Sequence, residues 1–292
     1  MKFTKMHGIG NDYVYVNCFE ENIHNATELA KAISNRHLGV GADGLITVGP
    51  SEIAEVRMRI YNADGSEAEM CGNGIRCVAK YAYERQLAHT HGNFSIPGQQ
   101  SFPISINIET GKGLLVVGLL ADENDVVEKV CVNMGQPVIN PKDIPVDLPG
   151  EQIVEEDIDV EGDNFTITCV SMGNPHAVIF CENLEQIDLS HIGPAIENHS
   201  LFPNRINVHF VQINDPEDFT MRTWERGSGI TLACGTGACA CSVAAVLTGR
   251  LKRVTKAHLP GGDLELNWCE EDNCVYMTGS ATQVFTGDWP EQ

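Results

Sequence analysis

Alternating apolar and polar side chains predict several strands in the first half of the chain. The clearest strand is expected at residues 55–62, which include the alternating run Val-Arg-Met-Arg-Ile-Tyr. Further strands are expected at residues 13–16 and 44–48. A short helix is expected at residues 26–35, where Thr27 is a suitable N-cap. The first half is therefore expected to contain both strands and a helix.

The second half predicts the same succession of elements. It opens with a strand at residues 177–180 and continues with a helix at residues 189–198, for which Ser190 is a suitable N-cap. Two strands are then expected at residues 208–213 and 219–224. The two halves consequently predict one common order of elements.

Each half then enters its longest apolar helix, expected at residues 75–86 and 238–249. The second helix is almost wholly apolar, and a helix that is apolar on all sides is surrounded by protein. The simplest solution is that the strands of each half wrap around its own helix. Further strands are expected at residues 104–108, 114–119, 126–132, 264–268 and 275–279.

The chain of 292 residues is long enough for two domains. Four prolines between residues 137 and 149 indicate a connection between the halves. The last thirty residues are strand-like and have no place in the second copy's order, so we expect them to return to the first domain. The expected domains are residues 1–120, completed by strands within 265–292, and residues 121–264.

An internal repeat supports this division. At an offset of 163 residues (234 − 71 = 163), twelve identities fall within 65 aligned positions, whereas chance would give roughly four. The pairs include Asn11 with Asn174, and Cys71-Gly72 with Cys234-Gly235. The repeat predicts two copies of one domain related by a pseudo-twofold axis. Such an axis would place equivalent residues on opposite sides of a shared cleft.

The repeated Cys-Gly-x-Gly element carries the candidate chemistry. Cys71 and Cys234 each stand where a helix begins, and there the free N–H groups and the helix dipole favour a negative charge. A thiol in that position can have its pKa lowered. The same N–H groups can bind a carboxylate, and the glycines let a ligand approach the backbone. One element thus offers an acid–base group and half of a carboxylate clamp.

Two such elements suit racemisation or epimerisation at a Cα. The reaction needs a base on one face and an acid on the other, and its enediolate intermediate places charge on the carboxylate. No glycine loop with a partnered lysine indicates pyridoxal phosphate, so we expect no cofactor. Zinc is a weaker interpretation because Cys71 with Cys77, and Cys234 with its neighbours, lack Cys-x2-Cys spacing. A cysteine hydrolase using His176 would leave the twin cysteine without a purpose.

Charge and cysteine content narrow the class of protein. The net charge of −21, from 19 basic and 40 acidic residues, argues against a nucleic-acid partner. Part of the acidic excess lies at residues 151–163, where a solvated loop or hairpin edge is expected. Eleven cysteines, an odd number, without a signal peptide favour reduced thiols in the cytoplasm. No apolar run of about 18 residues suggests a membrane span, so no membrane partner is expected.

Several motifs are similar to those of one known family. They are His7-Gly8-Ile9-Gly10-Asn11-Asp12-Tyr13, Gly39-Val40-Gly41-Ala42-Asp43-Gly44, Tyr61-Asn62-Ala63-Asp64-Gly65-Ser66, Met70-Cys71-Gly72-Asn73-Gly74-Ile75-Arg76-Cys77, Gly173-Asn174-Pro175-His176, Asn204-Arg205-Ile206-Asn207, Glu225-Arg226-Gly227-Ser228-Gly229 and Ala233-Cys234-Gly235-Thr236-Gly237-Ala238-Cys239-Ala240. Together they resemble the diaminopimelate epimerases, which interconvert LL- and meso-diaminopimelate for lysine and peptidoglycan precursors. The implied fold is α+β, a pair of mixed β-barrel-like domains each wrapped around a central helix, usually as a homodimer.

The resemblance also implies roles for individual residues. Cys71 and Cys234 would be the acid–base thiols, supported by His176 and Glu225 as further catalytic groups. The backbone at Gly72-Asn73 and Gly235-Thr236 would hold the reacting carboxylate. The remaining substrate-binding residues implied are Asn11, Asn62, Asn174, Asn207, Glu225 and Arg226. No metal site is implied.

Departures and alternatives follow from the same residues. Gly44 stands where many members have Gln, and Ile230 where an acidic residue is common. Proline racemases and hydroxyproline epimerases resemble this chain in fold and twinned cysteines, but Glu225-Arg226 and Asn73 favour an acyclic substrate. Phenazine-type isomerases would lack the cysteine pair. A binding protein that kept the cleft is the alternative from another class.

Overall fold

The computed structural model describes residues 1–99 and 101–290, and the chain divides into two compact units. Unit 1 comprises residues 1–133 and 278–292, and unit 2 comprises residues 134–277. The boundaries at 133/134 and 277/278 lie later than the expected 120/121 and 264/265. The first lies later because strand β10 (Val127–Asn133) pairs with β9 (Gly113–Ala121) and so stays with unit 1.

Unit 1 is a mixed sheet with two helices. Its elements are β1 (Lys2–Gly8), β2 (Asn11–Asn17), α1 (Ala26–Ser34), β3 (Gly44–Gly49), β4 (Val56–Asn62), β5 (Glu67–Ala68), α2 (Gly72–Glu84), β6 (Phe94–Ser95), β7 (Ser101–Phe102), β8 (Ile104–Thr110), β9, β10 and the C-terminal β20 (Thr282–Asp288). Strand β1 is antiparallel to β2 and to β20. The parallel pairs β2–β3 and β4–β8 alternate with the antiparallel pairs β3–β4 and β8–β9.

Unit 2 repeats this order. Its elements are β11 (Glu156–Val160), β12 (Asp163–Ser171), β13 (Pro175–Phe180), the 3₁₀ turn η1 (Leu184–Gln186), α3 (Leu189–Glu197), β14 (Asn207–Asp215), β15 (Asp218–Glu225), β16 (Gly229–Thr231), α4 (Gly235–Leu247), β17 (Val254–Leu259), β18 (Gly262–Trp268) and β19 (Val275–Gly279), whose last two residues belong to unit 1. Strands β13 and β14 are parallel, β14 and β15 antiparallel, and β15 and β17 parallel. The pairings β2–β3, β3–β4 and β4–β8 of unit 1 thus have counterparts here.

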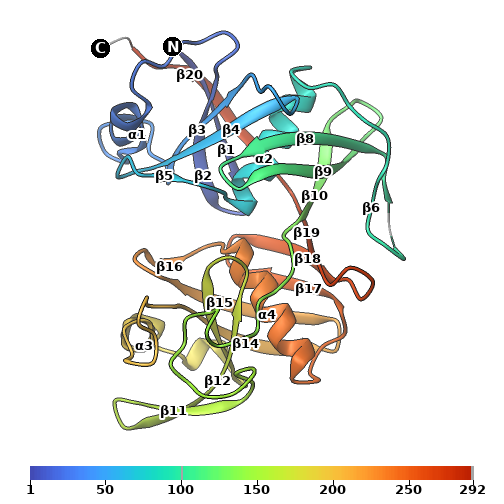
Figure 1. Ribbon diagram of the computed structural model, residues 1–292. Helices are drawn as coiled ribbons and strands as arrows, with labels where there is room; N and C mark the ends of the chain where they lie inside the picture. The colour runs from blue at the N-terminus through green and yellow to red at the C-terminus, as the bar shows by residue number, and fades with distance from the viewer. Residues whose placement is uncertain (100, 291–292) are drawn as a thin grey trace. The chain divides into compact units, whose positions relative to one another are not determined.

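The long helix of each unit lies inside its sheet. Helix α2 packs against β1, β2, β3, β4, β9 and β10, and α4 packs against β12, β13, β14, β17 and β18 (Figure 1). Nearly every residue of α4 is buried, which agrees with its apolar composition on all sides. The fold is therefore the expected α+β arrangement, with one central helix in each unit.

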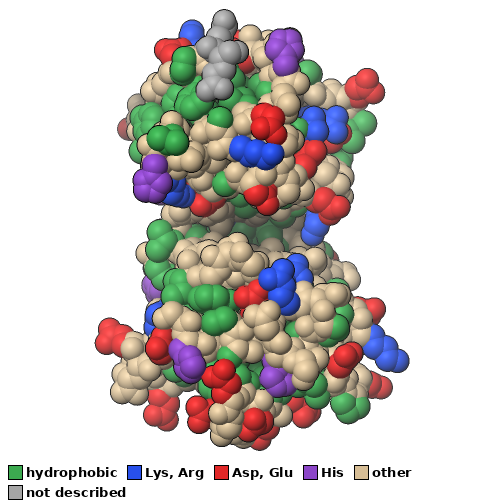
Figure 2. Space-filling view, turned by 90° about the vertical axis from the view of Figure 1, so that its left-hand side faces the viewer, with side chains coloured by type: hydrophobic (Ala, Val, Ile, Leu, Met, Phe, Trp, Pro, Cys, Tyr) green, Lys and Arg blue, Asp and Glu red, His purple; other side chains and the backbone are tan. Residues whose placement is uncertain are grey.

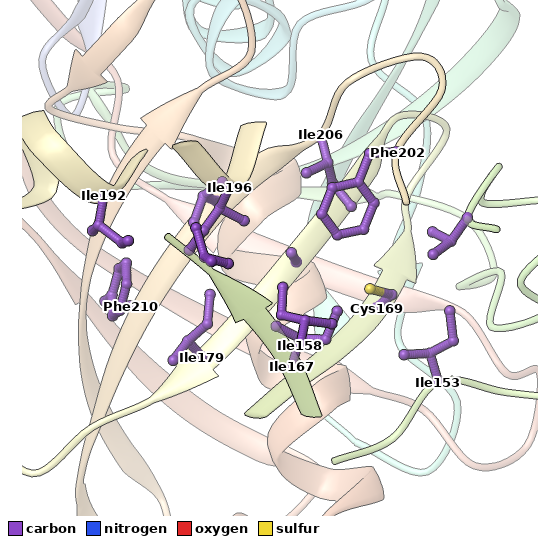
Figure 3. Close-up of a cluster of buried hydrophobic side chains, with 14 of the residues drawn as sticks. Ile153, Ile158, Ile167, Cys169, Ile179, Ile192, Ile196, Phe202, Ile206 and Phe210 are labelled. Carbon is purple, nitrogen blue, oxygen red and sulfur yellow. The ribbon is translucent and has the colours of Figure 1, made fainter. Parts of the chain in front are cut away.

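The short helices cover the outer face of each sheet. Ile192 and Ile196 of α3 belong to one buried cluster with Ile167, Ile179 and Phe210 of β12, β13 and β14 (Figure 3). In unit 1, Ala30 and Ile33 of α1 pack in the same way against Val14, Val16 and Leu45. Each such buried side chain contributes roughly 1.5–3 kcal/mol by leaving water. This packing holds β2 beside β3, and β13 beside β14.

Helix starts differ from the expected positions. The N-caps of α1 and α3 are Asn25 and Asp188, whose side chains accept from the N–H groups of Glu28 and His191. Thr27 and Ser190 are therefore not the caps, because the preceding Asn and Asp reach the first-turn amides themselves. Helices α2 and α4 begin at Gly72 and Gly235, three residues before the expected starts. Consequently the N-caps of both long helices are the two cysteines.

The acidic stretch forms a hairpin edge. Strands β11 and β12 pair antiparallel around Glu161 and Gly162, which have φ angles of 58° and 94°. Two consecutive positive φ angles are typical of tight hairpin turns. Elsewhere acidic and basic side chains are spread over the visible face of each unit (Figure 2).

No helix in residues 1–99 and 101–290 is long and apolar enough to span a membrane.

Candidate active site

The thiol of Cys71 caps helix α2 in unit 1. Cys71 has extended φ and ψ angles of −140° and 116°, and its Sγ accepts from the N–H of Gly74 at 3.3 Å. The same thiol donates to Asn11 Oδ1, also at 3.3 Å. The sulfur is therefore held between a helix N-terminus, which favours a thiolate, and an amide oxygen, which accepts a thiol proton.

Asn11 is itself held by a carboxylate. Its Nδ2 donates to Asp43 Oδ2 at 2.7 Å, which leaves Oδ1 directed at Cys71. Asp43 also accepts from the backbone N–H of Asp12 at 3.1 Å, and Arg36 binds its other oxygen at 2.9 Å. Burial opposes ionisation of Asp12, but hydrogen bonds from Arg36 and Lys5 outweigh it and lower its pKa. Asp43, held by Arg36, therefore fixes the orientation of the Asn11 amide.

Tyr13 completes the surroundings of Cys71. The ring is buried, and its hydroxyl is near enough to the side chains of Asn11 and Cys71 to interact with both. Burial, followed by negative charge at Cys71 and Asp43, raises the pKa of Tyr13 well above its ordinary value. Tyr13 therefore stays a neutral phenol beside the thiol at physiological pH.

Cys234 caps helix α4 in unit 2, with φ and ψ angles of −126° and 100°. Its Sγ lies 3.7 Å from Thr236 Oγ1. Burial, and then the negative charge of Glu225, raise the pKa of Cys234 well above its ordinary value. A helix N-terminus alone led us to expect a lowered thiol pKa, but here the cost of burying a charge outweighs the dipole. Cys234 consequently rests as a thiol.

A buried histidine pair lies next to Cys234. His176 Nε2 lies 3.0 Å from Asn174 Oδ1, and His176 Nδ1 lies 2.8 Å from His209 Nε2. Cys234 Sγ and one ring nitrogen of each histidine all lie within 4.8 Å of one another. Burial lowers the pKa of His176 well below its ordinary value and that of His209 to about 3. Both imidazoles are therefore neutral.

The other expected site residues already form hydrogen bonds within the protein. Glu225 Oε1 accepts from Thr231 Oγ1 at 2.6 Å at the end of β15. Asn207 is tied to the backbone: its Nδ2 donates to Pro175 O at 2.7 Å, and its Oδ1 accepts from Arg226 N at 3.0 Å. Its position therefore links β13 to the segment that carries Glu225 and Arg226.

Three further residues are engaged locally. Arg226 Nη1 donates to Asn204 O at 2.9 Å. Asn73 Oδ1 accepts from Arg76 Nη2 at 3.0 Å, and Asn62 Nδ2 donates to Ser66 Oγ at 3.0 Å. The side chain of Asn73 thus faces its own helix, which leaves its backbone N–H as the group suited to an anion.

The first-turn backbone is similar in both units. Gly72 and Asn73 are the first residues of α2, and Gly235 and Thr236 are the first residues of α4. N–H groups in the first turn of a helix lack partners within the helix and point outward along its axis. Each cysteine therefore stands beside donors suited to a carboxylate.

Both departures from the family pattern have a location. A Cβ at Gly44 would lie 2.2 Å from the carbonyl oxygen of Tyr61 and 2.9 Å from the Tyr13 ring. A larger side chain does not fit this backbone, because Tyr13 and β4 occupy the space. Ile230 lies on β16 with 52% of its surface exposed, so its side chain is in contact with solvent.

Sequence reasoning did not single out Tyr13, Asp43 or His209. The repeat contained a usable signal, because the offset pairs Tyr13 with His176 (176 − 13 = 163). It also pairs Ile46 with His209 (209 − 46 = 163), although these residues differ in type. The paired residues differ in chemistry at both positions, so the identities of the repeat do not mark them.

Comparisons with known proteins place the chain in a family. The sequence profile of the diaminopimelate epimerase family matches residues 3–140 and 168–284. The diaminopimelate epimerase of Acetivibrio thermocellus is 49% identical over 288 residues, covering 99% of this chain and 98% of that protein. That of Agathobacter rectalis is 48% identical over 295 residues, covering 99% of each.

Solved structures show the fold at lower identity. The structure of a probable proline racemase from Agrobacterium radiobacter K84 covers 100% of this chain and 93% of its own, with a TM-score of 0.66 and 13% identity. At that identity the likeness concerns the fold alone. Because the family profile and the two relatives extend over most of the chain, this protein belongs to the diaminopimelate epimerase family.

Proposed function

We propose that this protein interconverts LL- and meso-diaminopimelate by a two-base reaction that uses no cofactor. Cys71 acts as the thiolate base on one face of the Cα, and Cys234 acts as the thiol acid on the opposite face. One observation carries the proposal: in a member of this family, both cysteines cap equivalent buried helices. The substrate is therefore a small amino acid with a carboxylate beside the reacting carbon.

The proton balance follows from the two thiols. The Cys71 thiolate removes the α-proton and becomes a thiol, while Cys234 gives its proton to the other face and becomes a thiolate. The carbanion-like intermediate places its charge on the α-carboxylate. Backbone N–H groups at Gly72-Asn73 and Gly235-Thr236 stabilise that charge. The reverse direction exchanges the roles of the two cysteines.

The resting protonation states support this assignment of roles. Burial and Glu225 raise the pKa of Cys234, so this thiol keeps its proton at neutral pH. The neutral His176 nearby supplies no positive charge that would favour a thiolate there. Cys234 is consequently the acid of the resting enzyme, with His176 and Glu225 adjusting its proton transfer.

Charged and amide side chains select the substrate. Diaminopimelate carries two ammonium and two carboxylate groups, which need several hydrogen-bonding partners and few fixed charges. We assign Arg226 to a carboxylate, because a planar guanidinium binds it through two parallel bonds, and Glu225 to an ammonium group. Asn11, Asn62, Asn174 and Asn207 would line the pocket.

Proton NMR of the reduced protein with LL-diaminopimelate in D2O tests the proposal. We expect the α-proton signal to disappear while the meso isomer forms, and EDTA and hydroxylamine to leave the rate unchanged. Exchange of proline or hydroxyproline α-protons instead would refute the substrate. Absence of exchange with all three substrates, in folded and reduced protein, would refute the enzyme activity.

The cellular setting is part of the same proposal. We place the protein in the cytoplasm, in the supply of lysine and peptidoglycan precursors, because a reaction that uses two thiols needs a reducing compartment. Its charge of −21 disfavours nucleic acid as a partner.

We also propose a homodimer, because Val284 and Phe285 are exposed on β20 and are suited to an interface. Light scattering at micromolar concentration distinguishes a dimer from a monomer.

A further inference from the structure

A chain of hydrogen bonds runs through the interior of unit 2. It joins Thr223 Oγ1 to His209 Nδ1 at 3.0 Å, His209 Nε2 to His176 Nδ1 at 2.8 Å, and His176 Nε2 to Asn174 Oδ1 at 3.0 Å. Thr223 and both histidines are buried, so water does not compete for the two bonds among them. Each ring nitrogen of both histidines therefore has a protein partner.

The chain has a definite direction. Asn174 Oδ1 is an acceptor, so His176 carries its proton on Nε2, and a neutral imidazole must then accept at Nδ1. The donor to that nitrogen is Nε2–H of His209, which in turn accepts at Nδ1 from the Thr223 hydroxyl. The donor of His209 thus matches the tautomer that Asn174 favours and occupies the side of His176 where a second hydrogen would stand.

This arrangement disfavours a charged His176. An imidazolium carries hydrogen on both nitrogens, so Nδ1–H would point at Nε2–H of His209 across 2.8 Å. Two donors cannot share that distance, so His209 would have to move its hydrogen to Nδ1 and donate it to Thr223 Oγ1. A charged His176 therefore requires both hydrogen bonds of His209 to reverse direction, in addition to the cost of burying the charge.

The fold itself does not require a histidine at position 209. Ile46 occupies the equivalent position in unit 1, where it pairs in register with Ile60 as His209 pairs with Thr223. A Cβ at Gly74 would touch Ile46 Cδ1, just as a Cβ at Gly237 would touch His209 Cε1. An apolar side chain thus fills this position next to the first thiol. The hydrogen-bonded histidines beside Cys234 are therefore not needed for packing, and a chemical role accounts for them.

We propose that His209 is a positioning residue that holds His176 in the neutral Nε2–H tautomer and thereby keeps Cys234 protonated between turnovers. The assignment rests on the proposed role of Cys234 as the acid. Other charged and titratable groups also act on the cluster: Glu225 and Cys241 act on Cys234, and Arg226 acts on His176. His209 differs from these groups because its donor faces His176 directly.

A metal ion is the competing use of the same side chains. One thiol and two imidazoles are donor types that zinc accepts. However, the two facing nitrogens already form a hydrogen bond with each other, and the outer nitrogens bind Thr223 and Asn174. All four ring nitrogens are thus engaged, which favours proton positioning.

The test compares a donor with an acceptor of equal length at position 209. His209→Gln keeps an N–H donor near His176 Nδ1, whereas His209→Glu presents a carboxylate that accepts from Nδ1–H and favours a charged His176. The rate of iodoacetamide alkylation is measured against pH for each cysteine peptide by mass spectrometry. We expect the Cys234 midpoint to fall by about one pH unit or more in His209→Glu relative to His209→Gln. The Cys71 midpoint should stay unchanged in the same samples.

Two results would overturn the proposal. One is an equal Cys234 midpoint in the Gln and Glu variants when circular dichroism shows both to be folded. The other is the same shift in a His176→Asn background, since the effect must pass through His176.

A measurement on the unaltered protein keeps the test independent of variant folding. Nitrogen-15 NMR of histidine-labelled enzyme at pH 7 should place hydrogen on Nε2 of both His176 and His209, with His176→Asn assigning the signals. Hydrogen on Nδ1 of His176, or a charged ring, would refute the proposal. Neither this measurement nor the alkylation uses diaminopimelate, so failure of α-proton exchange would count against the proposed function alone.

Discussion

Tyr13 of β2 and His176 of β13 hold equivalent positions in their units, because Tyr13 is in register with Gly44 and His176 with Asn207. Each side chain lies close to the cysteine that caps its unit's long helix. The repeated backbone therefore surrounds one thiol with a neutral phenol and an amide, and the other with two neutral imidazoles. Two thiols with equivalent backbone positions thus have different chemical surroundings.

Loss of either thiol should abolish most of the activity. Cys71→Ser and Cys234→Ser each replace a group whose acid–base contribution is roughly 10²–10⁴-fold in rate. Epimerisation followed by NMR should fall by that factor in both variants. Cys18→Ser and Cys181→Ser are matched controls, since they form another pair at the same offset (181 − 18 = 163). A serine variant at 71 or 234 with nearly full activity would contradict the two-thiol mechanism.

Equivalent glycines should differ in their tolerance of alanine. A Cβ at Gly237 would lie 2.3 Å from His209 Cε1 and 3.0 Å from Cys234 Sγ, and the ring is held by hydrogen bonds at both ends. We expect Gly237→Ala to lower the free energy of unfolding by about 1–3 kcal/mol.

Gly74→Ala is the matched comparison. Its Cβ would meet the flexible ends of Ile46 and Met58, at 2.8 and 3.0 Å. The gain in helix propensity, about 1 kcal/mol, should offset much of that strain. Urea unfolding of both variants measures the difference, and equal destabilisation would show that the histidine ring yields as easily as the apolar ends.

Asp43 should matter to Cys71 through Asn11. Asp43→Ala removes the acceptor that holds Asn11 Nδ2 at 2.7 Å, so the amide loses its fixed orientation toward the thiol. A lost hydrogen bond to a charged group costs roughly 1.5–3 kcal/mol, so kcat/KM should fall about tenfold or more.

Asp122→Ala is the control for this variant. Asp122 also accepts two backbone hydrogen bonds, from Asn124 and Val126, but in an exposed turn. Its kcat/KM should stay within about twofold of the parent. Equal losses in both variants would mean that Asp43 acts through general stability.

The neutral histidines should make the folded state sensitive to acid. The pKa of His209 is about 3 in the folded protein against 6.5 unfolded, so the unfolded state binds a proton first as the pH falls below 6.5. The contribution of neutral His209 to the free energy of unfolding is fully present above pH 6.5 and declines as the pH falls toward 3.

His209→Ile removes this titration and introduces the side chain of the equivalent position in unit 1. Between pH 8 and pH 5, its free energy of unfolding should fall less than the parent's by roughly 2 kcal/mol. Urea titrations at both pH values measure the difference. Parallel pH dependence in the two proteins would show that His209 is charged when folded.

The repeat, the two central helices and the cysteines at their starts were predictable because they rest on local patterns. Hydrophobic spacing reports which face of a strand or helix is buried, and glycines after a cysteine report a helix start that can approach a ligand. The resemblance to diaminopimelate epimerases rested on motifs of the same local kind, and the comparisons confirm it.

The surroundings of the thiols were not readable in the same way. Asp43 lies 32 residues from Asn11 and His209 lies 33 residues from His176, and each pair meets because β2 and β3, or β13 and β14, are parallel neighbours. Burial, which raises the pKa of Cys234 against the pull of its helix, also depends on strands far apart in the chain. The sequence thus determined that two cysteines stand at equivalent helix starts, whereas their protonation states follow from the packing of distant strands, since burial and hydrogen-bond partners determine the cost of a charge.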